Sequence, residues 1–343
     1  MTQKLSIYLF SLTLALVLLA ILSLFLGVYQ FEYGFMETLK LLILDHSQLS
    51  TTDLYVLKDI RIPRIIMAIL IGSGLAVSGT SLQGMFKNPL ASPDLIGITS
   101  GAVLFAAVTI VLGSYIRTLI PEFLHYSLLS LMSFIGSILT MSFVYKMSST
   151  NGKTNIAVLL LSGVAITALT GATTGLLTYL STDEELRNLT FWTLGSLAGS
   201  NWTKVAILSV VILISLGALI NKGKALNAMM LGEKDAEHLG VNVEKLKKRI
   251  VLFTALMVGT SVAFSGTIGF VGLIVPYILR LLFKSNYYMI LPLSALCGSI
   301  LLLVADSLSR LLVAPSELPI GILTAIMGAP VFIAILIRFK KSL

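Results

Sequence analysis

IVLFTALMVGTSVAFSGTIGFVGLIVPYIL, residues 250–279, is a charge-free run that is too long for one straight membrane helix. At 1.5 Å per residue it would extend roughly 45 Å, whereas the hydrocarbon core of a bilayer is about 30 Å thick. Residues that interrupt helices lie in its second half, namely Ser265, Gly266, Gly269, Gly272 and Pro276. We predict that the run forms two short or broken crossings and that these five residues form a helix break with a role in gating.

The charges that flank this run support an even number of crossings. Basic residues precede it at Lys245, Lys247, Lys248 and Arg249, and follow it at Arg280 and Lys284. Basic loops favour the cytoplasmic side of a membrane. One crossing would leave one basic cluster outside, whereas two crossings keep both clusters inside.

The rest of the chain supplies eight more apolar runs. They cover residues 5–31, 65–86, 95–116, 123–145, 154–182, 205–221, 285–305 and 318–337. We read the first run as a retained span, because it is too long for a signal peptide and no cleavage site closes it. The sequence thus predicts ten spans. With both termini inside, sixteen of the 24 Lys and Arg residues lie inside and eight outside.

Composition agrees with a membrane protein. The chain is 56% hydrophobic and 12% charged, whereas soluble domains carry about 25% charged residues. We predict an all-α polytopic membrane protein, one transmembrane domain over residues 1–343, with an inside loop at 222–249 and outside segments at 32–60 and 183–203. The formal charge of +8 is explained by basic residues that concentrate on the inside of the membrane. We therefore expect no nucleic-acid partner.

The sequence contains no convincing catalytic or metal site. Gly152-Lys153-Thr154 resembles the end of a phosphate loop, but Met147 stands where that loop needs glycine. The three histidines lie in loops or at span ends, so a membrane-embedded serine hydrolase is not expected. No Cys/His cluster has metal-ligand spacing. We expect no bound cofactor and no metal.

The fifth span carries a stripe of small and weakly polar residues on one helix face. It consists of Gly163, Thr167, Thr170, Gly171, Thr174 and Thr178. The stripe fits either close helix packing through small residues or the lining of a translocation pathway. Periodicity alone does not separate the two.

The connection between spans two and three is irregular. Asn88, Pro89, Ser92, Pro93 and Gly97 interrupt it near membrane depth. Irregular backbone is tolerated there only where it is buried or lines a cavity. We predict a pathway lining, with an ordinary inside turn as the alternative.

Three arginines lie outside, against the charge rule. Arg61 and Arg64 begin the second span, and Arg310 precedes Pro315-Ser-Glu-Leu-Pro319. Arginines at span ends can reach lipid headgroups. Alternatively, outward guanidiniums suit a protein partner that carries carboxylates.

The 222–249 loop contains two short helical patterns, about 225–230 and 233–239, parted by Gly232 and closed by Gly240. Several of its residues are apolar, although no span contains them. Such a segment either docks in a groove of a partner protein or lies on the membrane surface.

Several blocks in order resemble the permeases of the siderophore, haem and cobalamin ABC importers. These blocks are Arg61-Ile-Pro-Arg64, Ser78-Gly79 through Gln83-Gly84, 88–97, 231–241, 265–276, Glu317-Leu-Pro-Ile-Gly321 and Gly328-Ala-Pro330. The resemblance implies a type II ABC importer permease fold in the cytoplasmic (inner) membrane of a bacterium. It also implies a dimer with an identical or paralogous permease, with the pathway between the subunits and the fifth span along it.

The same resemblance implies two protein contacts. Arg61, Arg64 and Arg310 would grip acidic residues on a substrate-binding (lipo)protein. The coupling loop would sit on a separate ATPase subunit, which holds the ATP, through Met230, Leu231, Gly232, Glu233, Ala236, Leu239, Gly240 and Val241.

The substrate expectation rests on one local form. Ala91-Ser-Pro-Asp94 is the form associated with siderophore permeases, so we expect an iron(III)-siderophore substrate, with haem or cobalamin as the alternative. An ion-coupled secondary transporter is a rival class. Such a protein usually carries carboxylates within the membrane, and Asp94 and Asp306 are the candidates.

Overall fold

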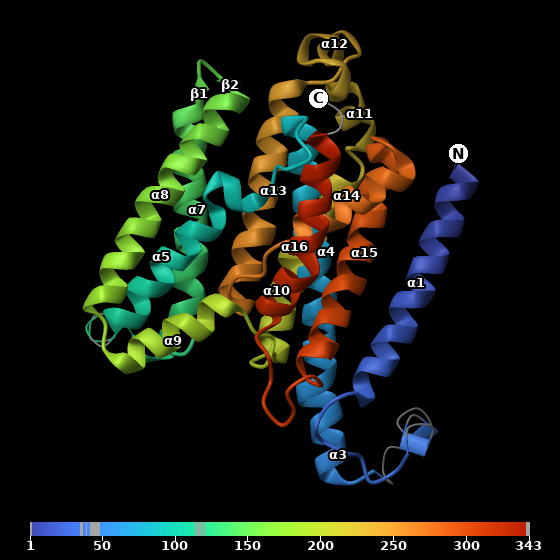
Figure 1. The fold of residues 1–343 in the computed structure, drawn as a ribbon, viewed down its shortest axis with the longest axis vertical. Coiled ribbons are helices and arrows are strands. Elements are labelled where there is room, and N and C mark those ends of the chain that lie inside the picture. The colour runs from blue at the N-terminus through green and yellow to red at the C-terminus, as the bar shows by residue number, and fades with distance from the viewer. Residues whose placement is uncertain are drawn as a thin grey trace.

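The computed structural model describes the chain except for residues 1, 35–36, 39, 42–48, 114, 116–117, 119–120 and 341–343. Helices dominate it, and two-residue strands form one short hairpin (Figure 1). The helices and strands are α1 (Thr2–Phe25), α3 (Thr51–Tyr55), a π-helical segment (Val56–Arg61), α4 (Ile62–Phe86), a 3₁₀ turn (Pro93–Ile96), α5 (Ile98–Val111), a 3₁₀ turn (Glu122–Leu124), α7 (Leu128–Ser148), β1 (Ser149–Thr150), β2 (Lys153–Thr154), α8 (Ile156–Leu180), α9 (Asp183–Leu194), α10 (Trp202–Ile220), α11 (Gly223–Leu231), α12 (Glu233–His238), α13 (Val243–Ser265), α14 (Val271–Phe283), α15 (Tyr287–Ser309) and α16 (Ile320–Lys340).

The apolar helices agree with the predicted spans. Within the described residues, seven helices are long and apolar enough to cross a membrane, and three shorter apolar helices cover Ile98–Val111, Val271–Phe283 and Ile320–Ile335. Together they correspond one for one to the ten predicted spans. The prediction of an all-α polytopic fold with broken segments is confirmed.

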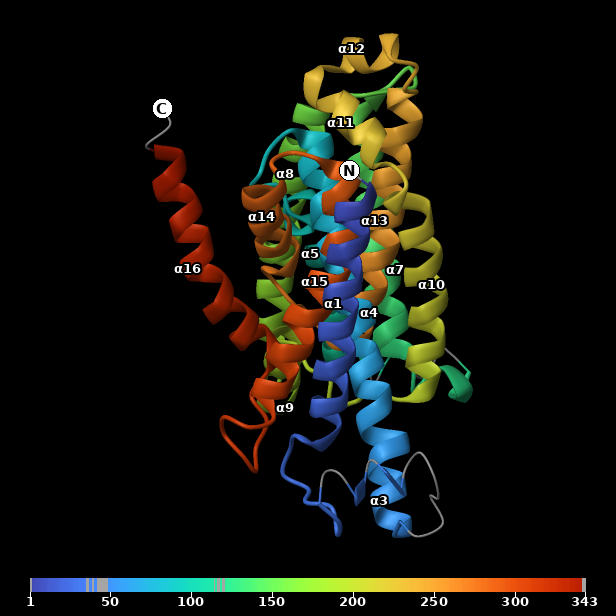
Figure 2. The ribbon, with the colours of Figure 1, turned by 90° about the vertical axis from the view of Figure 1, so that its right-hand side faces the viewer.

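The run at 250–279 is broken where the sequence predicts. Helix α13 ends at Ser265, and Gly266 follows with φ of +69°. Four residues later Phe270, also left-handed with φ of +67°, leads into α14. Figures 1 and 2 place the start of α13 and the end of α14 at the same end of the molecule as α12 and both chain termini. The two basic clusters therefore lie at one end.

Helix α4 forms the centre of the bundle, and nearly all of its residues are buried. It packs against α10, α13, α14 and α15. Glycines permit the closest of these contacts: a Cβ added to Gly79 would lie 1.8 Å from the carbonyl oxygen of Gly272, and one added to Gly72 would lie 2.3 Å from that of Gly298. Small residues allow helix backbones to approach in this way.

The remaining helices surround this centre. Helices α5, α7 and α8 pack with one another on one side, and α1 lies along the opposite edge of the bundle. Helix α16 leans away from the bundle towards its C-terminal end (Figure 2).

Both segments that were predicted to lie outside, 32–60 and 183–203, contain helix. Helix α4 is preceded without interruption by α3 and the π-helical segment, so one helix covers Thr51–Phe86. Residues 183–194 form α9, which begins with a capping box between Thr182 and Glu185. That pattern, a threonine followed three residues later by glutamate, is a helix-start signal, and the turn-rich composition of 183–203 obscured it.

Candidate functional site

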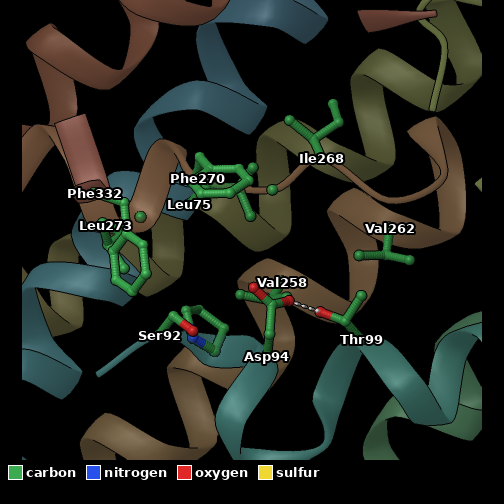
Figure 3. Close-up of a pocket in the computed structure, with 13 residues that line it drawn as sticks. Leu75, Ser92, Asp94, Thr99, Val258, Val262, Ile268, Phe270, Leu273 and Phe332 are labelled. Carbon is green, nitrogen blue, oxygen red and sulfur yellow. Dashed lines mark hydrogen bonds between the residues drawn. The ribbon is translucent and has the colours of Figure 1, made fainter. Parts of the chain in front are cut away.

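The irregular connection before α5 and the break after α13 meet at one cavity of about 280 Å³ (Figure 3). The connection contributes Ser92, Pro93 and Asp94 to it, and the break contributes Gly269 and Phe270. Its wall is completed by Leu75, Thr99, Val258, Val262, Ile268, Gly272, Leu273 and Phe332. Irregular backbone at membrane depth thus lines a cavity in both places, as expected where water or a substrate must be accommodated.

The cavity wall is mostly apolar and carries little charge. Of the described residues that line it, Asp94 alone is charged. Thr99 donates a hydrogen bond of 2.6 Å to its Oδ1 (Figure 3). The described part of the chain holds no cluster of His, Cys, Asp and Glu that could bind a metal ion. The wall therefore presents one oriented carboxylate among mostly apolar groups.

Thr99 and Phe270 are among the wall residues that were not singled out from sequence. Thr99 orients the Asp94 carboxylate from the first turn of α5, beyond the left-handed Gly97 with φ of +81°. Phe270 has the left-handed backbone that bulky residues rarely adopt. Its ring packs on α16, since a Cβ added to Gly328 would lie 2.4 Å from it. The sequence indicates Phe270 only through its position just before α14. Its contact with Gly328 of α16 could not be predicted, because α16 is distant in sequence.

Asn88 and Pro89 lie outside this cavity. Pro89 lines a separate pocket with Arg280 and Tyr287, and its carbonyl accepts a hydrogen bond of 3.4 Å from Arg280. The Asn88 side chain accepts from the backbone N–H of Leu90 and so shapes a local turn. Asn88 thus shapes a local turn, and neither residue lines the cavity at the helix breaks.

The stripe on α8 divides into a packed part and an open part. A Cβ added to Gly163 would lie 2.3 Å from the carbonyl oxygen of Leu95, and Thr167 lies 3.3 Å from Ser100 between hydroxyl oxygens. Thr170 is buried as well. For these three residues the structure favours helix packing over pathway lining.

The open part of the stripe begins at Gly171, where an added Cβ would meet nothing within 4 Å. Thr174 and Thr178 are partly exposed. These three residues lie on a surface that is uncovered in the single subunit.

The three outer arginines are buried, which corrects the expectation of free outward guanidiniums. Arg61, Arg64 and Arg310 are 5–6% exposed. Arg64 forms ion pairs of 2.8 Å with Asp306 and with Glu317, and Arg310 lies 3.3 Å from Asp306.

Backbone carbonyls and a serine hydroxyl accept hydrogen bonds from the guanidinium groups of Arg61 and Arg310. Arg61 donates to the carbonyls of Leu24 and Tyr29, and Arg310 donates to the Ser23 hydroxyl. Buried charges require partners of this kind. In this conformation the arginines therefore join α1, α4 and α15 and are not free to bind another protein.

The same ion pairs bear on the secondary-transporter alternative. Asp306 is fully buried on α15, but two guanidiniums neutralise it. A carboxylate that couples transport to an ion must be able to take up and release that ion. The pairing with Arg64 and Arg310 disfavours this role for Asp306.

The 222–249 loop forms the two short helices that its pattern predicts. Helices α11 and α12 meet at Gly232, which has φ of +148°, and Gly240, with φ of +82°, ends the segment. Leu231 and Leu239 are 68% and 64% exposed. Leu231 ends α11 and Leu239 follows α12, so two largely exposed apolar side chains lie at the ends of these short helices.

Of the other predicted coupling residues, Gly240 is exposed and the rest are less accessible. Ala236 is fully buried. The expectation that it contacts the ATPase is therefore corrected, because it packs in the core of the subunit. Met230, Gly232, Glu233 and Val241 are partly buried.

Comparison with known proteins identifies the family. Residues 15–338 match the model of the FecCD transport family. The chain is 41% identical to the hemin transport system permease protein HmuU of Yersinia pestis over 284 residues, which cover 83% of this chain and 84% of that protein. It is 34% identical to the molybdate import system permease protein MolB of Haemophilus influenzae over 339 residues, which cover 97% and 96% of the two chains.

A solved structure shares the fold as well. It is described as an inward-facing ABC transporter of the metal-chelate type, is 34% identical and superposes with a TM-score of 0.82 over 96% of this chain and 98% of its own. Sequence and fold agree along nearly the whole length, and the chain belongs to the FecCD transport family of ABC importer permeases.

Proposed function

We propose that this permease carries an iron(III)-siderophore complex across the cytoplasmic membrane of a bacterium, using ATP hydrolysed by a separate subunit. The supporting observation is the cavity at the two helix breaks, whose weakly polar wall presents one carboxylate and no metal-binding cluster among its described residues. Such a wall lets a chelate pass with its metal still wrapped in the ligand. The Ala91-Ser-Pro-Asp94 form supplies three of the lining residues, Ser92, Pro93 and Asp94.

Haem is the second candidate cargo. The 41% identity to a hemin permease favours it, and an apolar wall with one oriented carboxylate also suits a porphyrin.

Transport would proceed by alternating access between two permeases, identical or paralogous. Large apolar side chains on α8 and α16 remain exposed in the single subunit, among them Leu161, Leu169 and Ile326. Together with the open Gly171 face of α8, they form the surface that we assign to the second permease. The remaining apolar surface faces lipid.

The ATPase would dock at the α11–α12 tip. Leu231 and Leu239 are the exposed apolar residues there, and a short apolar projection of this kind fits a groove in a partner protein. ATP would remain on that partner, and this subunit would bind no cofactor itself.

A substrate-binding lipoprotein would dock at the opposite end, near Arg61, Arg64 and Arg310. Glu317 is half-exposed while it pairs with Arg64. A carboxylate of the binding protein would therefore reach Arg64 by replacing Glu317, so docking and opening of this ion pair would be linked.

The test of function is uptake into proteoliposomes that contain the permease with its ATPase and binding protein. Ferrichrome labelled with ⁵⁵Fe, hemin, cyanocobalamin and molybdate are offered separately, with ATP inside. We expect ATP-dependent accumulation of the ferric siderophore and none with a hydrolysis-deficient ATPase. Accumulation of hemin or cyanocobalamin alone would reject the siderophore assignment. Uptake that follows an ion gradient without ATP would reject the importer scheme.

The docking of the ATPase is tested by Leu231→Asp combined with Leu239→Asp. Placing two charges on the apolar tip should abolish co-purification of the ATPase, because the groove would then have to bury unpaired carboxylates. Leu112→Asp, at an exposed leucine beyond α5, is the matched control and should keep the ATPase bound. Normal co-purification of the double variant would contradict the docking assignment.

A further inference from the structure

Lys247 is a buried cation whose three hydrogen bonds connect the β1–β2 hairpin, α12 and the start of α13. It lies on the first turns of α13 and is 1% exposed. Its Nζ donates to the backbone carbonyl of Thr154 at 2.9 Å, to Glu233 Oε2 at 2.8 Å and to Glu244 Oε1 at 3.0 Å. A lysine ammonium has three donors, so each proton has its own acceptor.

Glu244 also binds Thr154, the last residue of β2, through its backbone N–H. Its Oε2 accepts a hydrogen bond of 2.9 Å from the backbone N–H of Thr154. Both polar groups of the Thr154 backbone are thus held by side chains from α13. The β1–β2 hairpin therefore moves with the start of α13 for as long as these bonds last.

Helix α12 reaches the hairpin through Lys247. A cavity of about 750 Å³ lies between them, lined by Glu233, Lys234 and Glu237 on one side and by Thr150 and Lys153 on the other. In Figure 1 the hairpin and α12 lie at the same end of the molecule, apart from each other, with α13 between. In the described part of the chain, the bond between Glu233 and Lys247 is a polar link from α12 across this gap.

The hairpin in turn leads to the cavity at the helix breaks. Asn155 directly follows Thr154 and caps α8 through hydrogen bonds to Ala157 and Val158. About two turns further, α8 packs at Gly163 against Leu95 of the irregular connection. Contacts therefore run without interruption from α12 to the wall of the cavity.

We propose that Lys247 is a positioning residue that makes α12 and the β1–β2 hairpin move as one unit, so that displacement of α12 reaches α8 and the cavity. The inference rests on the proposed function in that α12 is the segment the ATPase would move. A buried ammonium between two carboxylates is costly to break, because loss of one partner leaves charges unpaired. It therefore transmits displacement more faithfully than an apolar contact across an open cavity.

The test measures the distance between α12 and the hairpin with nitroxide labels on Thr150→Cys and Lys234→Cys. Cys297, the single cysteine, is replaced by serine. In the permease alone we expect a narrow distance distribution for the native Lys247 and a broad one for Lys247→Met. Glu233→Gln should also broaden the distance distribution, because it weakens the bond between α12 and Lys247 and keeps the bond between Glu244 and Thr154. Glu237→Gln should not, because Glu237 lines the same cavity but is not among the three acceptors of Lys247.

A second arm adds the ATPase and traps the complex with ATP and vanadate. With native Lys247 the label distance should stay the same on trapping, whereas Lys247→Met should shift it by several ångström because α12 then moves without the hairpin. Lys247→Arg, which keeps the cation, should restore the native response in part.

The two arms separate this inference from the proposed function. A Lys247→Met distribution as narrow as the native one would overturn the inference. So would a loss of thermal stability without any change in label distance, because that is the signature of a purely structural role. Failure of the ATPase to bind the native permease would sink the proposed function and leave the result of the first arm standing.

Discussion

At the scale of single residues, the most demanding arrangement is the carboxylate of Asp306. It is fully buried between α4 and α15, with Arg64 at 2.8 Å and Arg310 at 3.3 Å. Burying a lone charge costs far more than burying a paired one. Each of these three side chains is therefore tolerated at this depth because the other two are present.

Asp306→Asn should destabilise the protein strongly, because it leaves two buried guanidiniums with one carboxylate, Glu317, between them. Removing one partner of a buried ion pair costs about 3–5 kcal/mol. The measurement is thermal unfolding in detergent, followed by the loss of monodisperse protein. Asp59→Asn, the same change at an exposed outer position, is the control and should stay within about 0.5 kcal/mol. Equal melting of the two variants would show that the cluster is dispensable.

The sequence could place these arginines along the chain but could not orient them. Their outer position is a prediction from the span count, and the starts and ends of α4 and α15 put all three at the end of the molecule opposite α12. Their burial depends on Asp306 and Glu317, which lie 242 and 253 residues away from Arg64. Ala236 shows the same limit, because an apolar residue on a short loop helix can face the subunit core or a partner. Local pattern does not decide between the two.

At the scale of helices, backbone contact through glycine determines how closely α4 meets its neighbours. Gly79 faces Gly272 of α14, and Gly72 faces Gly298 of α15. In lipid, apolar helices gain little from hydrophobic burial against each other, so close packing carries more of the association energy. The position of α14, and with it the wall of the cavity, depends on this contact.

Gly79→Ala should therefore displace α14, since the added methyl group would lie 1.8 Å from the carbonyl oxygen of Gly272. Overpacking of this kind costs about 1–3 kcal/mol. Gly171→Ala is the matched control, because its added Cβ meets nothing within 4 Å and alanine favours helix over glycine by up to about 1 kcal/mol. Folded yield and melting temperature in detergent compare the two. A Gly79→Ala protein as stable as Gly171→Ala would contradict the contact.

The elements themselves were largely predictable. The breaks at Gly232, Gly240 and Gly266 follow from glycines that adopt positive φ, and the apolar runs fix the long helices. Helix α9 was missed because its residues are polar and its one clear signal, the capping box at Thr182, lies in a turn-rich segment. The packing of Gly163 was left open, since small residues suit both a helix contact and a smooth pathway.

At the scale of the whole molecule, every feature assigned to the ATPase lies at one end and every feature assigned to the binding protein lies at the other. Figures 1 and 2 place α11, α12, the hairpin and both termini together, with α3 and α9 at the opposite end. Basic residues concentrate at the α12 end. The positive-inside rule therefore predicts that this end faces the cytoplasm, where ATP is available.

Cysteine labelling decides this orientation. In a Cys297→Ser background, Lys234→Cys on α12 and Glu184→Cys on α9 are exposed positions at opposite ends of the molecule. A membrane-impermeant maleimide applied to intact spheroplasts should modify position 184 and reach position 234 only after permeabilisation. The excess of inside lysines and arginines makes the reverse orientation unfavourable, because each would have to cross the bilayer during insertion. Labelling of position 234 from outside would place α12 away from nucleotide and contradict the ATPase contact, whereas the link through Lys247 between α12 and the hairpin would still be tested by the label distances. Labelling of both positions from the same face would contradict the predicted orientation.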